Sequence, residues 1–344
     1  MKKLTILCLT FLTVAFSTAA VAKMTLKYGL APPPTHPHAK AAVLFADYVK
    51  EKTNGEITID VFPMGQLGGE RSMVEQVQGG TLDMADITTA VLSNFVPATG
   101  VFDMPFIWPT REVAYKVLAD PEFKKIIFDA FPKKGFVAIG YGENEFRDLT
   151  NTKREVRTPA DLKGLKIRVM EAPVYLETWR TLGASPVPMP FPEVYNALQQ
   201  GVIDGQENPI LTSILMKFTE VCPYATVLNY SLAETIKFVN IDLWEKFSPE
   251  QQQIFRDAAE IAIKANREES KKAIEKFTAE VEAGGKVTIT RLTPEERGAF
   301  FDAVQPVYKE FENKLGMIPQ KDEYGKYGGQ SYLSMTLDKI KQNQ

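Results

Sequence analysis

The stretch Thr158-Pro159-Ala160-Asp161-Leu162-Lys163-Gly164-Leu165-Lys166-Ile167-Arg168-Val169 carries the local signals from which the fold class can be predicted. Thr158 is a favourable N-cap residue, Pro159 fits the first helical position and Asp161 is an acid in the first turn, so a helix is expected to start here. The apolar residues over 165–169 then predict a buried strand, and residues 172–182 predict a helix. Such alternation of helix and strand is typical of α/β domains.

The residues after this stretch continue the alternation. Pro192 begins a predicted helix that stops at Gly201, and residues 202–205 predict a short strand and a turn. Before the stretch, the N-terminal half repeats the order strand, helix, strand, helix, strand, which suggests βαβ units and a largely parallel sheet. Its predicted elements are 25–28, 39–52, 57–61, 70–78 and 82–88, followed by a strand over 136–141. The pattern predicts two α/β halves, near 24–145 and 146–233.

One long helix is predicted in the C-terminal third. Ser248-Pro249-Glu250-Gln251 forms a capping box, and apolar residues recur at helical spacing as far as Ala283. At 1.5 Å per residue this helix would reach ~50 Å, which is longer than one domain of this size. We therefore expect it to span both halves, with a break between Asn266 and Lys272 as the alternative. Residues 293–296 start one more helix by the same capping logic.

The first 22 residues read as a secretory signal peptide rather than as part of the fold. Lys2 and Lys3 precede an apolar run over 4–16, and Ala20 and Ala22 supply the small residues of a cleavage site before Lys23. The alternative, a membrane anchor, requires ~20 apolar residues, which is more than this run offers. The mature chain is therefore expected in the periplasm and not embedded in a membrane. Its single cysteine, Cys222, is expected to be buried.

Composition and motifs exclude several function classes. The 40 basic and 43 acidic residues give no electrostatic reason to expect nucleic acid as a partner. His36 and His38 are the only histidines, and there is no Gly-x-Ser-x-Gly, His-Glu-x-x-His or Cys-x-x-Cys motif. We therefore predict no metal, no cofactor and no enzymatic activity, with a secreted hydrolase or lyase as the disfavoured alternative. The glycine-rich segment 65–69 is predicted to be a tight turn into the helix at Glu70.

Three segments carry a resemblance to a known family. They are Gln66-Leu67-Gly68-Gly69-Glu70, the stretch 158–169 quoted above, and Met189-Pro-Phe-Pro-Glu-Val-Tyr-Asn-Ala-Leu-Gln-Gln-Gly-Val-Ile-Asp-Gly-Gln-Glu-Asn-Pro209. Together they resemble the solute-binding proteins of tripartite ATP-independent periplasmic (TRAP) transporters, the DctP-type family. The resemblance implies a two-lobed, class II-like periplasmic binding protein with an interdomain cleft and a long helix spanning both lobes. The implied organisation is a signal peptide at 1–22, lobe I at 23–145 plus 234–273, lobe II at 146–233 plus 274–327, and a C-terminal segment at 328–344.

The same resemblance implies a carboxylate site. Arg168 corresponds to the arginine that clamps the ligand carboxylate, for which a planar guanidinium offers a bidentate match. Without the motif, Arg168 would read as a strand residue with a surface ion pair. Arg147 corresponds to a second arginine, whose alternative role is a salt bridge with Asp148 or Glu145.

Further ligand-binding positions follow from the resemblance, each with a simpler alternative. Asn208 is expected to donate its amide to the carboxylate, and Phe191 to pack on the ligand body or else in the core. Glu70 is expected to face ligand hydroxyls or simply to favour the helix N-terminus. The remaining predicted binding residues are His36, Thr88 and Tyr230.

The implied function is capture of a small organic acid and delivery to the membrane subunits of a TRAP transporter. Thr88 or its neighbour stands where sialic acid binders carry a further acid, and Tyr230 stands where several relatives have a histidine, so both weaken a sialic acid assignment. No second clamp for a distal carboxylate is evident. These departures favour a monocarboxylate with an apolar, aromatic or hydroxylated body. The alternatives are a C4-dicarboxylate, a sugar acid, or service to a sensor instead of a transporter.

Overall fold

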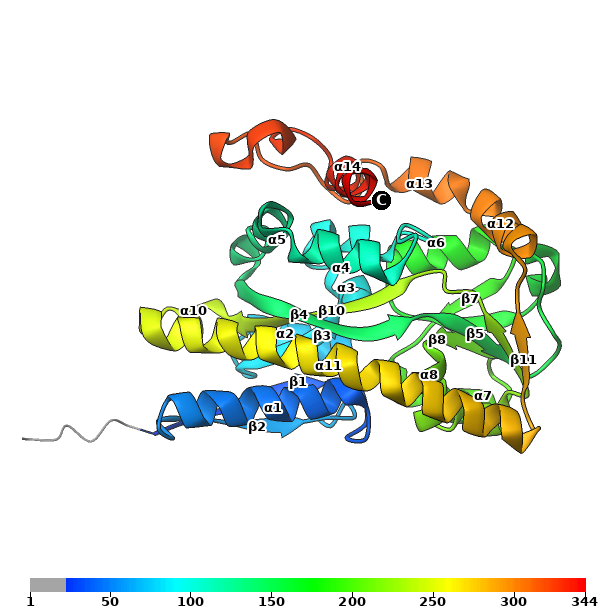
Figure 1. The fold of residues 1–344 in the computed structure, drawn as a ribbon, viewed down its shortest axis with the longest axis horizontal. Helices are drawn as coiled ribbons and strands as arrows, with labels where there is room; N and C mark the ends of the chain where they lie inside the picture. Colours follow the sequence, from blue (N-terminus) through cyan, green and yellow to red (C-terminus); the bar gives the residue numbers. More distant parts are fainter. Residues whose placement is uncertain (1–22) are drawn as a thin grey trace, which may run out of the picture.

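The structure is a computed structural model that describes residues 23–344. The predicted signal peptide lies outside the described residues. Within the described range, the strands form one five-stranded and one six-stranded sheet, and helices cover both (Figure 1). The strands of the first sheet, in spatial order, are β2 (Ile57–Phe62), β1 (Met24–Leu30), β3 (Met84–Thr88), β10 (Leu232–Asn240) and β4 (Phe136–Phe146). Those of the second are β11 (Thr288–Arg291), β9 (Tyr224–Val227), β5 (Asp148–Asn151), β8 (Gly205–Asn208), β6 (Lys166–Val169) and β7 (Ser185–Pro188).

The first sheet begins with the predicted βαβαβ order. Helices α1 (Pro37–Lys52) and α2 (Glu70–Gln78) connect the parallel strands β1, β2 and β3. Strand β10 is antiparallel to both β3 and β4, so the prediction of a largely parallel sheet is only partly correct. The reason is that β10 returns from the second half of the chain, and its direction is not set by a βαβ connection.

In the second sheet, two predictions made from local sequence are wrong in detail. The capping box at Thr158 is present, but it opens a 3₁₀ helix over Pro159–Leu162 instead of an α-helix. The strand expected over 202–205 begins only at Gly205, because Gly201 turns in the left-handed region at a φ of 70°. The predicted helices at 172–182 and from Pro192 are found as α6 (Pro173–Thr181) and as a 3₁₀ turn leading into α7 (Val194–Gln199).

Two chain segments run side by side between the first sheet and the second. Strand β4 leads through Arg147 into β5, and β9 leads back through Tyr230 into β10. The backbone N–H of Arg147 donates to the Ser231 carbonyl at 2.8 Å, and the N–H of Tyr230 donates to the Arg147 carbonyl at 3.2 Å. These paired crossings are the narrow connection around which the functional residues gather.

The predicted long helix, α11 (Pro249–Gly284), is unbroken over 36 residues and starts with the expected capping box. It packs against α1 and β4 of the first half and against α8 (Ile210–Leu215) of the second (Figure 1). The break considered after Asn266 does not occur. Asn266 is buried there, and its Oδ1 accepts a hydrogen bond from the Glu143 backbone N–H at 3.1 Å, so a polar side chain is satisfied without unwinding the helix.

The C-terminal residues fold back over the first half. Helix α14 (Tyr332–Asn343) packs against α4 (Arg111–Ala119), and the buried Lys339 donates to Asp120 at 2.8 Å and to Glu122 at 2.7 Å. The remaining helices are α3 (Thr89–Leu92), α5 (Pro121–Phe128), α9 (Phe218–Val221), α10 (Ile241–Trp244), α12 (Pro294–Ala303) and α13 (Gln305–Phe311). From residue 23 onward, no helix has the length and apolar character needed to cross a bilayer. Cys222 is buried, as predicted.

Candidate functional site

A small cavity lies at the crossing segments and is lined by elements of both halves. Its volume is about 30 Å³, room for little more than a water molecule. The lining residues are Ala31, Pro32, Glu70, Thr88, Asn144, Arg147, Arg168, Met170, Phe191, Asn208 and Thr212. Six of the eight residues predicted from the sequence are therefore brought together here, from positions 70 to 208.

Arg168 is a lining residue whose guanidinium has a fully buried hydrogen-bond donor without a partner in the described chain. It lies on β6 and is 2% exposed. Its Nε and Nη2 donate to the Met189 carbonyl at 2.9 and 2.6 Å, while the buried Nη1 has no hydrogen-bond partner among the described residues. Burial lowers the pKa of Arg168 to about 10, which leaves the guanidinium charged at neutral pH. A buried cation with a free donor is an arrangement suited to an anionic group.

Arg147 is instead paired within the protein. Its Nε donates to Oε2 of Glu207 at 2.5 Å, and Nη2 donates to Oε1 of Glu207 at 3.0 Å and to Oδ1 of Asn208 at 3.1 Å. Burial alone would lower the pKa of Arg147, but Glu207 raises it above the ordinary value. The partner is thus neither Asp148 nor Glu145, the two salt-bridge alternatives considered from the sequence.

Asn208 is held by the same group of side chains. One hydrogen of its amide nitrogen is donated to Oε1 of Gln206 at 2.5 Å, and Gln206 in turn donates to Thr150 and Ser213. All four side chains are buried. The Asn208 amide is therefore fixed in orientation at the cavity wall, with its oxygen directed to Arg147.

Glu70 and Thr88 form a separate polar pair in the wall. The backbone N–H of Thr88 donates to Oε1 of Glu70 at 3.0 Å, and the Thr88 hydroxyl donates to Oε2 at 2.8 Å. Burial raises the pKa of Glu70, although these two hydrogen bonds and the two nearby arginines oppose the shift. Phe191 lies beside Arg168, with the guanidinium carbon 5.9 Å from the ring centroid.

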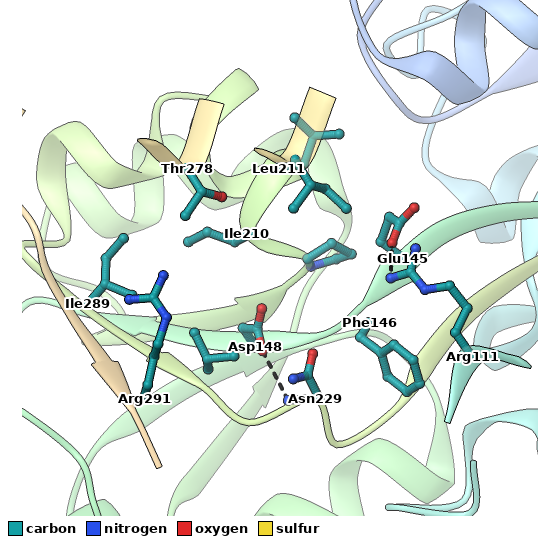
Figure 2. Close-up of a pocket in the computed structure, with 13 residues that line it drawn as sticks. Arg111, Glu145, Phe146, Asp148, Ile210, Leu211, Asn229, Thr278, Ile289 and Arg291 are labelled. Atoms are coloured by element: carbon teal, nitrogen blue, oxygen red, sulfur yellow. Dashed lines mark hydrogen bonds and ion pairs between the residues drawn. The ribbon is translucent and has the colours of Figure 1, made fainter. Parts of the chain in front are cut away.

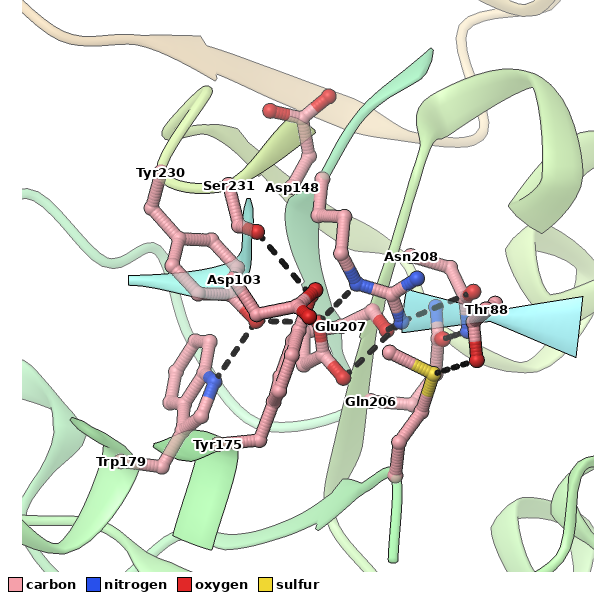
Figure 3. A network of polar contacts seen from close by, with 12 residues as sticks. Thr88, Asp103, Asp148, Tyr175, Trp179, Gln206, Glu207, Asn208, Tyr230 and Ser231 are labelled. Atoms are coloured by element: carbon pink, nitrogen blue, oxygen red, sulfur yellow. Dashed lines mark hydrogen bonds and ion pairs between the residues drawn. The ribbon is translucent and has the colours of Figure 1, made fainter. Parts of the chain in front are cut away.

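Tyr230 does not line the cavity. Its hydroxyl donates to Oε2 of Glu207 at 2.5 Å and accepts from Trp179 Nε1 at 3.2 Å (Figure 3). The neighbouring Tyr175 donates to Asp103 at 3.0 Å. Tyr230 therefore contributes to the site through Glu207, a contact that depends on tertiary packing and that no local sequence signal indicates.

His36 also lies behind the wall. It is fully buried at the N-cap of α1, and its Nε2 is 3.3 Å from the hydroxyl oxygen of Thr212, a lining residue. The neighbouring His38 contacts Asn144, another lining residue, with Nδ1 2.9 Å from Oδ1. Asn144, Thr212 and Glu207 were not among the predicted site residues. Glu207 stands next to Asn208 in the quoted motif, but nothing in its local pattern indicates a buried ion pair.

A second cavity, of about 180 Å³, is lined by residues of the crossing segments and of α8, α11 and β11 (Figure 2). Asn144 and Arg147 line the first cavity, while Glu145, Phe146 and Asp148 line the second. This division departs from simple strand alternation, because Glu145 has a φ of 77° in the left-handed region and turns the backbone there. The rest of its wall is mainly apolar, and the Thr278 hydroxyl there is buried without a hydrogen-bond partner in the described part of the chain. Over residues 23–344, no cluster of three or more His, Cys, Asp or Glu side chains is arranged to hold a metal ion.

The chain matches the family profile of bacterial extracellular solute-binding proteins, family 7 (DctP), over residues 28–314. It is 35% identical over 297 residues to a solute-binding protein of Verminephrobacter eiseniae, covering 86% of this chain and 88% of the relative.

Two solved structures have the same fold. The sugar acid binding protein of Advenella mimigardefordensis in complex with galactonate superposes with a TM-score of 0.86 at 29% identity, covering 94% of this chain and 99% of that one. A TRAP periplasmic solute-binding protein of Sulfurospirillum deleyianum with bound succinate superposes with a TM-score of 0.80 at 33% identity, covering 89% and 98%. These proteins are solute-binding proteins rather than enzymes. The chain therefore belongs to the DctP family, the solute-binding proteins of TRAP transporters.

Proposed function

We propose that this protein captures a small organic acid in the periplasm, with Arg168 binding the ligand carboxylate, and delivers it to the membrane subunits of a TRAP transporter. The observation that carries the proposal is the buried Nη1 of Arg168, which has no partner in the described chain and belongs to a residue lining the cavity. A carboxylate would supply the missing acceptor and a compensating charge at once. Export through the leader at residues 1–22, with cleavage before Lys23, is part of the proposal.

Charge balance favours a monocarboxylate with a hydroxylated body. Arg147 is already compensated by Glu207, so Arg168 is left as the cationic group that awaits an anion. A second carboxylate would have to share the cavity with Glu70, which would oppose it by like-charge repulsion. Glu70 could instead accept hydrogen bonds from ligand hydroxyl groups. The galactonate complex of the Advenella relative supports this ligand class.

A C4-dicarboxylate is the second candidate, supported by the succinate complex of the Sulfurospirillum relative. For such a ligand, the second amide hydrogen of Asn208, which donates only one hydrogen to Gln206, is the group available to hold the distal carboxylate. A role as the ligand-binding partner of a sensor would use the same site and the same chemistry.

The binding cycle that we propose is a hinge motion between two lobes. Lobe I comprises residues 23–145 and 234–273, lobe II comprises 146–233 and 274–327, and segment 328–344 follows. The composition of the cavity wall supports this cycle, because lobe I contributes Glu70 and Thr88 and lobe II contributes Arg147, Arg168 and Asn208, so that separation of the lobes would open the site to a ligand.

The test is a thermal-shift screen of organic acids followed by calorimetry on Arg168→Ala. A ligand at ~100 times its Kd adds ~2.7 kcal/mol to stability, so true ligands raise Tm clearly. Arg168→Ala is expected to weaken binding by roughly 100-fold, because a hydrogen bond to a charged group contributes about 1.5–3 kcal/mol. Arg168→Lys should recover only part of the affinity, since lysine presents a point charge.

Arg180→Ala is the matched control. Arg180 is exposed on α6 and pairs only with Glu177 in the described chain, so its removal should leave the affinity unchanged. Wild-type affinity in Arg168→Ala, with the fold intact by circular dichroism, would rule out the carboxylate assignment.

A further inference from the structure

The two histidines of Thr35-His36-Pro37-His38 contact the site from behind. Neither lines the cavity, yet each touches a polar side chain that does. Both histidines are fully buried, at the start of α1. A buried imidazole has one donor and one acceptor nitrogen when neutral, so its surroundings decide which hydrogen-bonding face it offers to a neighbour.

The geometry determines which ring nitrogen of His36 carries the hydrogen. Its Nδ1 accepts the backbone N–H of His38 at 3.2 Å, so Nδ1 carries a lone pair. Burial lowers the pKa of His36 to about 3, which keeps the ring neutral and leaves the hydrogen on Nε2. Nε2 therefore donates to the Thr212 hydroxyl oxygen, 3.3 Å away. Because that oxygen is used as an acceptor and has no other hydrogen-bond partner in residues 23–344, the Thr212 O–H hydrogen is free to donate to a ligand.

A parallel chain of contacts fixes Asn144 through His38. Oδ2 of the buried Asp86 lies 2.6 Å from Lys237 Nζ, 2.7 Å from His38 Nε2 and 3.2 Å from the Tyr28 hydroxyl. Burial alone would raise the pKa of Asp86, but Lys237 and His38 hold it well below its usual range, so it is an ionised acceptor. His38 therefore donates from Nε2 to Asp86.

The other ring nitrogen of His38 orients the amide. Nδ1 lies 2.9 Å from Oδ1 of Asn144, which is also an acceptor, so His38 carries a hydrogen on both ring nitrogens, with the ionised Asp86 as its counter-ion. The amide oxygen of Asn144 therefore points to His38 and away from the ligand side. The Asn144 amide nitrogen, with two hydrogens and no hydrogen-bond partner among the described residues, is what remains for the cavity. The two histidines thus orient two hydrogen-bond donors, one from Thr212 and one from Asn144, in the same cavity wall.

We propose that His36 and His38 are positioning residues that fix Thr212 and Asn144 as hydrogen-bond donors to an oxygen acceptor of the bound acid. The inference rests on the proposed function, because it assumes that this cavity is the ligand site. It adds two ligand-contacting residues and gives the histidines a role in setting the polarity of the wall. A wall of fixed donors rejects a ligand that presents its own donor at this point, since two donors would then face each other unpaired.

The experiment is a double-mutant cycle on His36 and Thr212, with D-galactonate and succinate as probes in calorimetry. Thr212→Val removes the hydroxyl at nearly constant volume and should weaken the better-bound probe about tenfold, whereas Thr212→Ser keeps the hydroxyl and should stay within about twofold of wild type. His36→Phe should show a similar loss. The double variant His36→Phe/Thr212→Val should lose no more than Thr212→Val alone, because His36 acts through that hydroxyl.

Asn144→Leu gives a second arm that does not depend on the folding of the His36 variant, and it should also weaken binding about tenfold. Thr178→Val is the matched control, since Thr178 is a buried helical threonine outside the cavity. The inference is overturned if Thr212→Val and Asn144→Leu bind within twofold of wild type while Arg168→Ala has lost binding. It is also overturned if the losses of His36→Phe and Thr212→Val add up in the double variant.

Failure of the proposed function has a different signature. In that case wild type binds neither probe, or Arg168→Ala binds as well as wild type. Either result would also rule out the role assigned to the histidines.

Discussion

Two buried arginines lie at this site, and their surroundings assign them different tasks. Arg147 has Glu207 as a counter-ion, whose carboxylate also accepts from Tyr230, so this charge is compensated inside the protein. Arg168 is left with a free donor. Burying a charge is costly unless it is paired, so the Arg147–Glu207 pair is expected to matter for stability and Arg168 for binding.

Replacing Glu207 tests the first half of that statement. Glu207→Gln keeps the shape but removes the counter-charge of a fully buried arginine, and we expect a loss of about 3–5 kcal/mol in the free energy of unfolding, measured by urea denaturation. Glu177→Gln, which breaks the exposed pair with Arg180, should cost less than about 1 kcal/mol. Equal losses in the free energy of unfolding for the two variants would show that the buried Arg147–Glu207 pair contributes no more to stability than an exposed pair.

Asp148 should make stability depend on pH. Burial raises the pKa of its carboxyl to about 7, although the backbone N–H groups of Asn229 and Leu228 donate to it and oppose the shift. The unfolded value is about 3.9. The folded state therefore holds the proton more tightly, and this residue's contribution to stability is lost as pH rises from about 4 to about 7.

Asp148→Asn should remove that dependence, because the amide oxygen can still accept both N–H groups. We expect the difference in Tm between the variant and wild type to shift in favour of the variant as the pH rises from 5 to 8, measured by calorimetry at fixed ionic strength. A difference between the two proteins that stays constant with pH would contradict the assignment. Other buried carboxyls titrate in both proteins and cancel in this comparison.

At the scale of elements, the long helix α11 can lie against the crossing strand β4 because that strand carries a glycine at the contact. A Cβ added at Gly140 would lie 2.5 Å from the Cβ of Ala259 on α11, which is closer than real side chains approach. Small residues on both elements therefore set the distance between helix and strand. Two turns further along, Asn266 and Arg267 of the helix bond to Glu143 of the same strand.

Gly140→Ala should force the helix away from the strand. We expect a loss of about 1–3 kcal/mol in the free energy of unfolding, the usual cost of overpacking a core. Gly284→Ala at the end of the same helix meets nothing within 4 Å and should be neutral or slightly stabilising. Chemical denaturation of both variants decides the point, and a neutral Gly140→Ala would mean that the contact can relax freely.

At the scale of the whole molecule, two cavities face each other across the crossing segments. The ligand-side cavity holds about 30 Å³ and the rear cavity about 180 Å³. In the hinge motion that we propose, a rotation about these segments that opens the ligand side is expected to close the other side. The rear cavity is therefore expected to shrink when the cleft opens, so its filling should bias the molecule towards the closed form.

Thr278→Leu fills part of the rear cavity and removes a buried hydroxyl that has no partner in the described chain. We expect a several-fold lower Kd for D-galactonate or succinate and slower dissociation, measured by surface plasmon resonance, because less of the binding energy is needed to close the lobes. Thr278→Val removes the hydroxyl without the added volume and is the control. Weaker binding by the leucine variant would refute this coupling.

Much of the architecture could be predicted from local signals. The βαβαβ order, the two α/β halves and the unbroken helix from Pro249 follow from apolar periodicity and capping residues, which act over a few neighbouring positions. The antiparallel placement of β10 could not be predicted, because it depends on which segments cross between the sheets. The strand start at Gly205 was misplaced because a short apolar run does not reveal where a turn ends.

For the candidate site, too, part could be predicted from the sequence and part could not. The sequence by itself predicted, through its resemblance to the family, that Arg168, Arg147, Asn208, Phe191, Glu70 and Thr88 belong to one site, and these six residues line one cavity. Only the tertiary structure decided that Glu207 neutralises Arg147, that Tyr230 supports Glu207, and that His36 stands behind Thr212, 176 positions away along the chain. The physical reason is that hydrogen bonds and ion pairs depend on distances of about 3 Å, and such distances between remote residues are set by packing, not by local sequence.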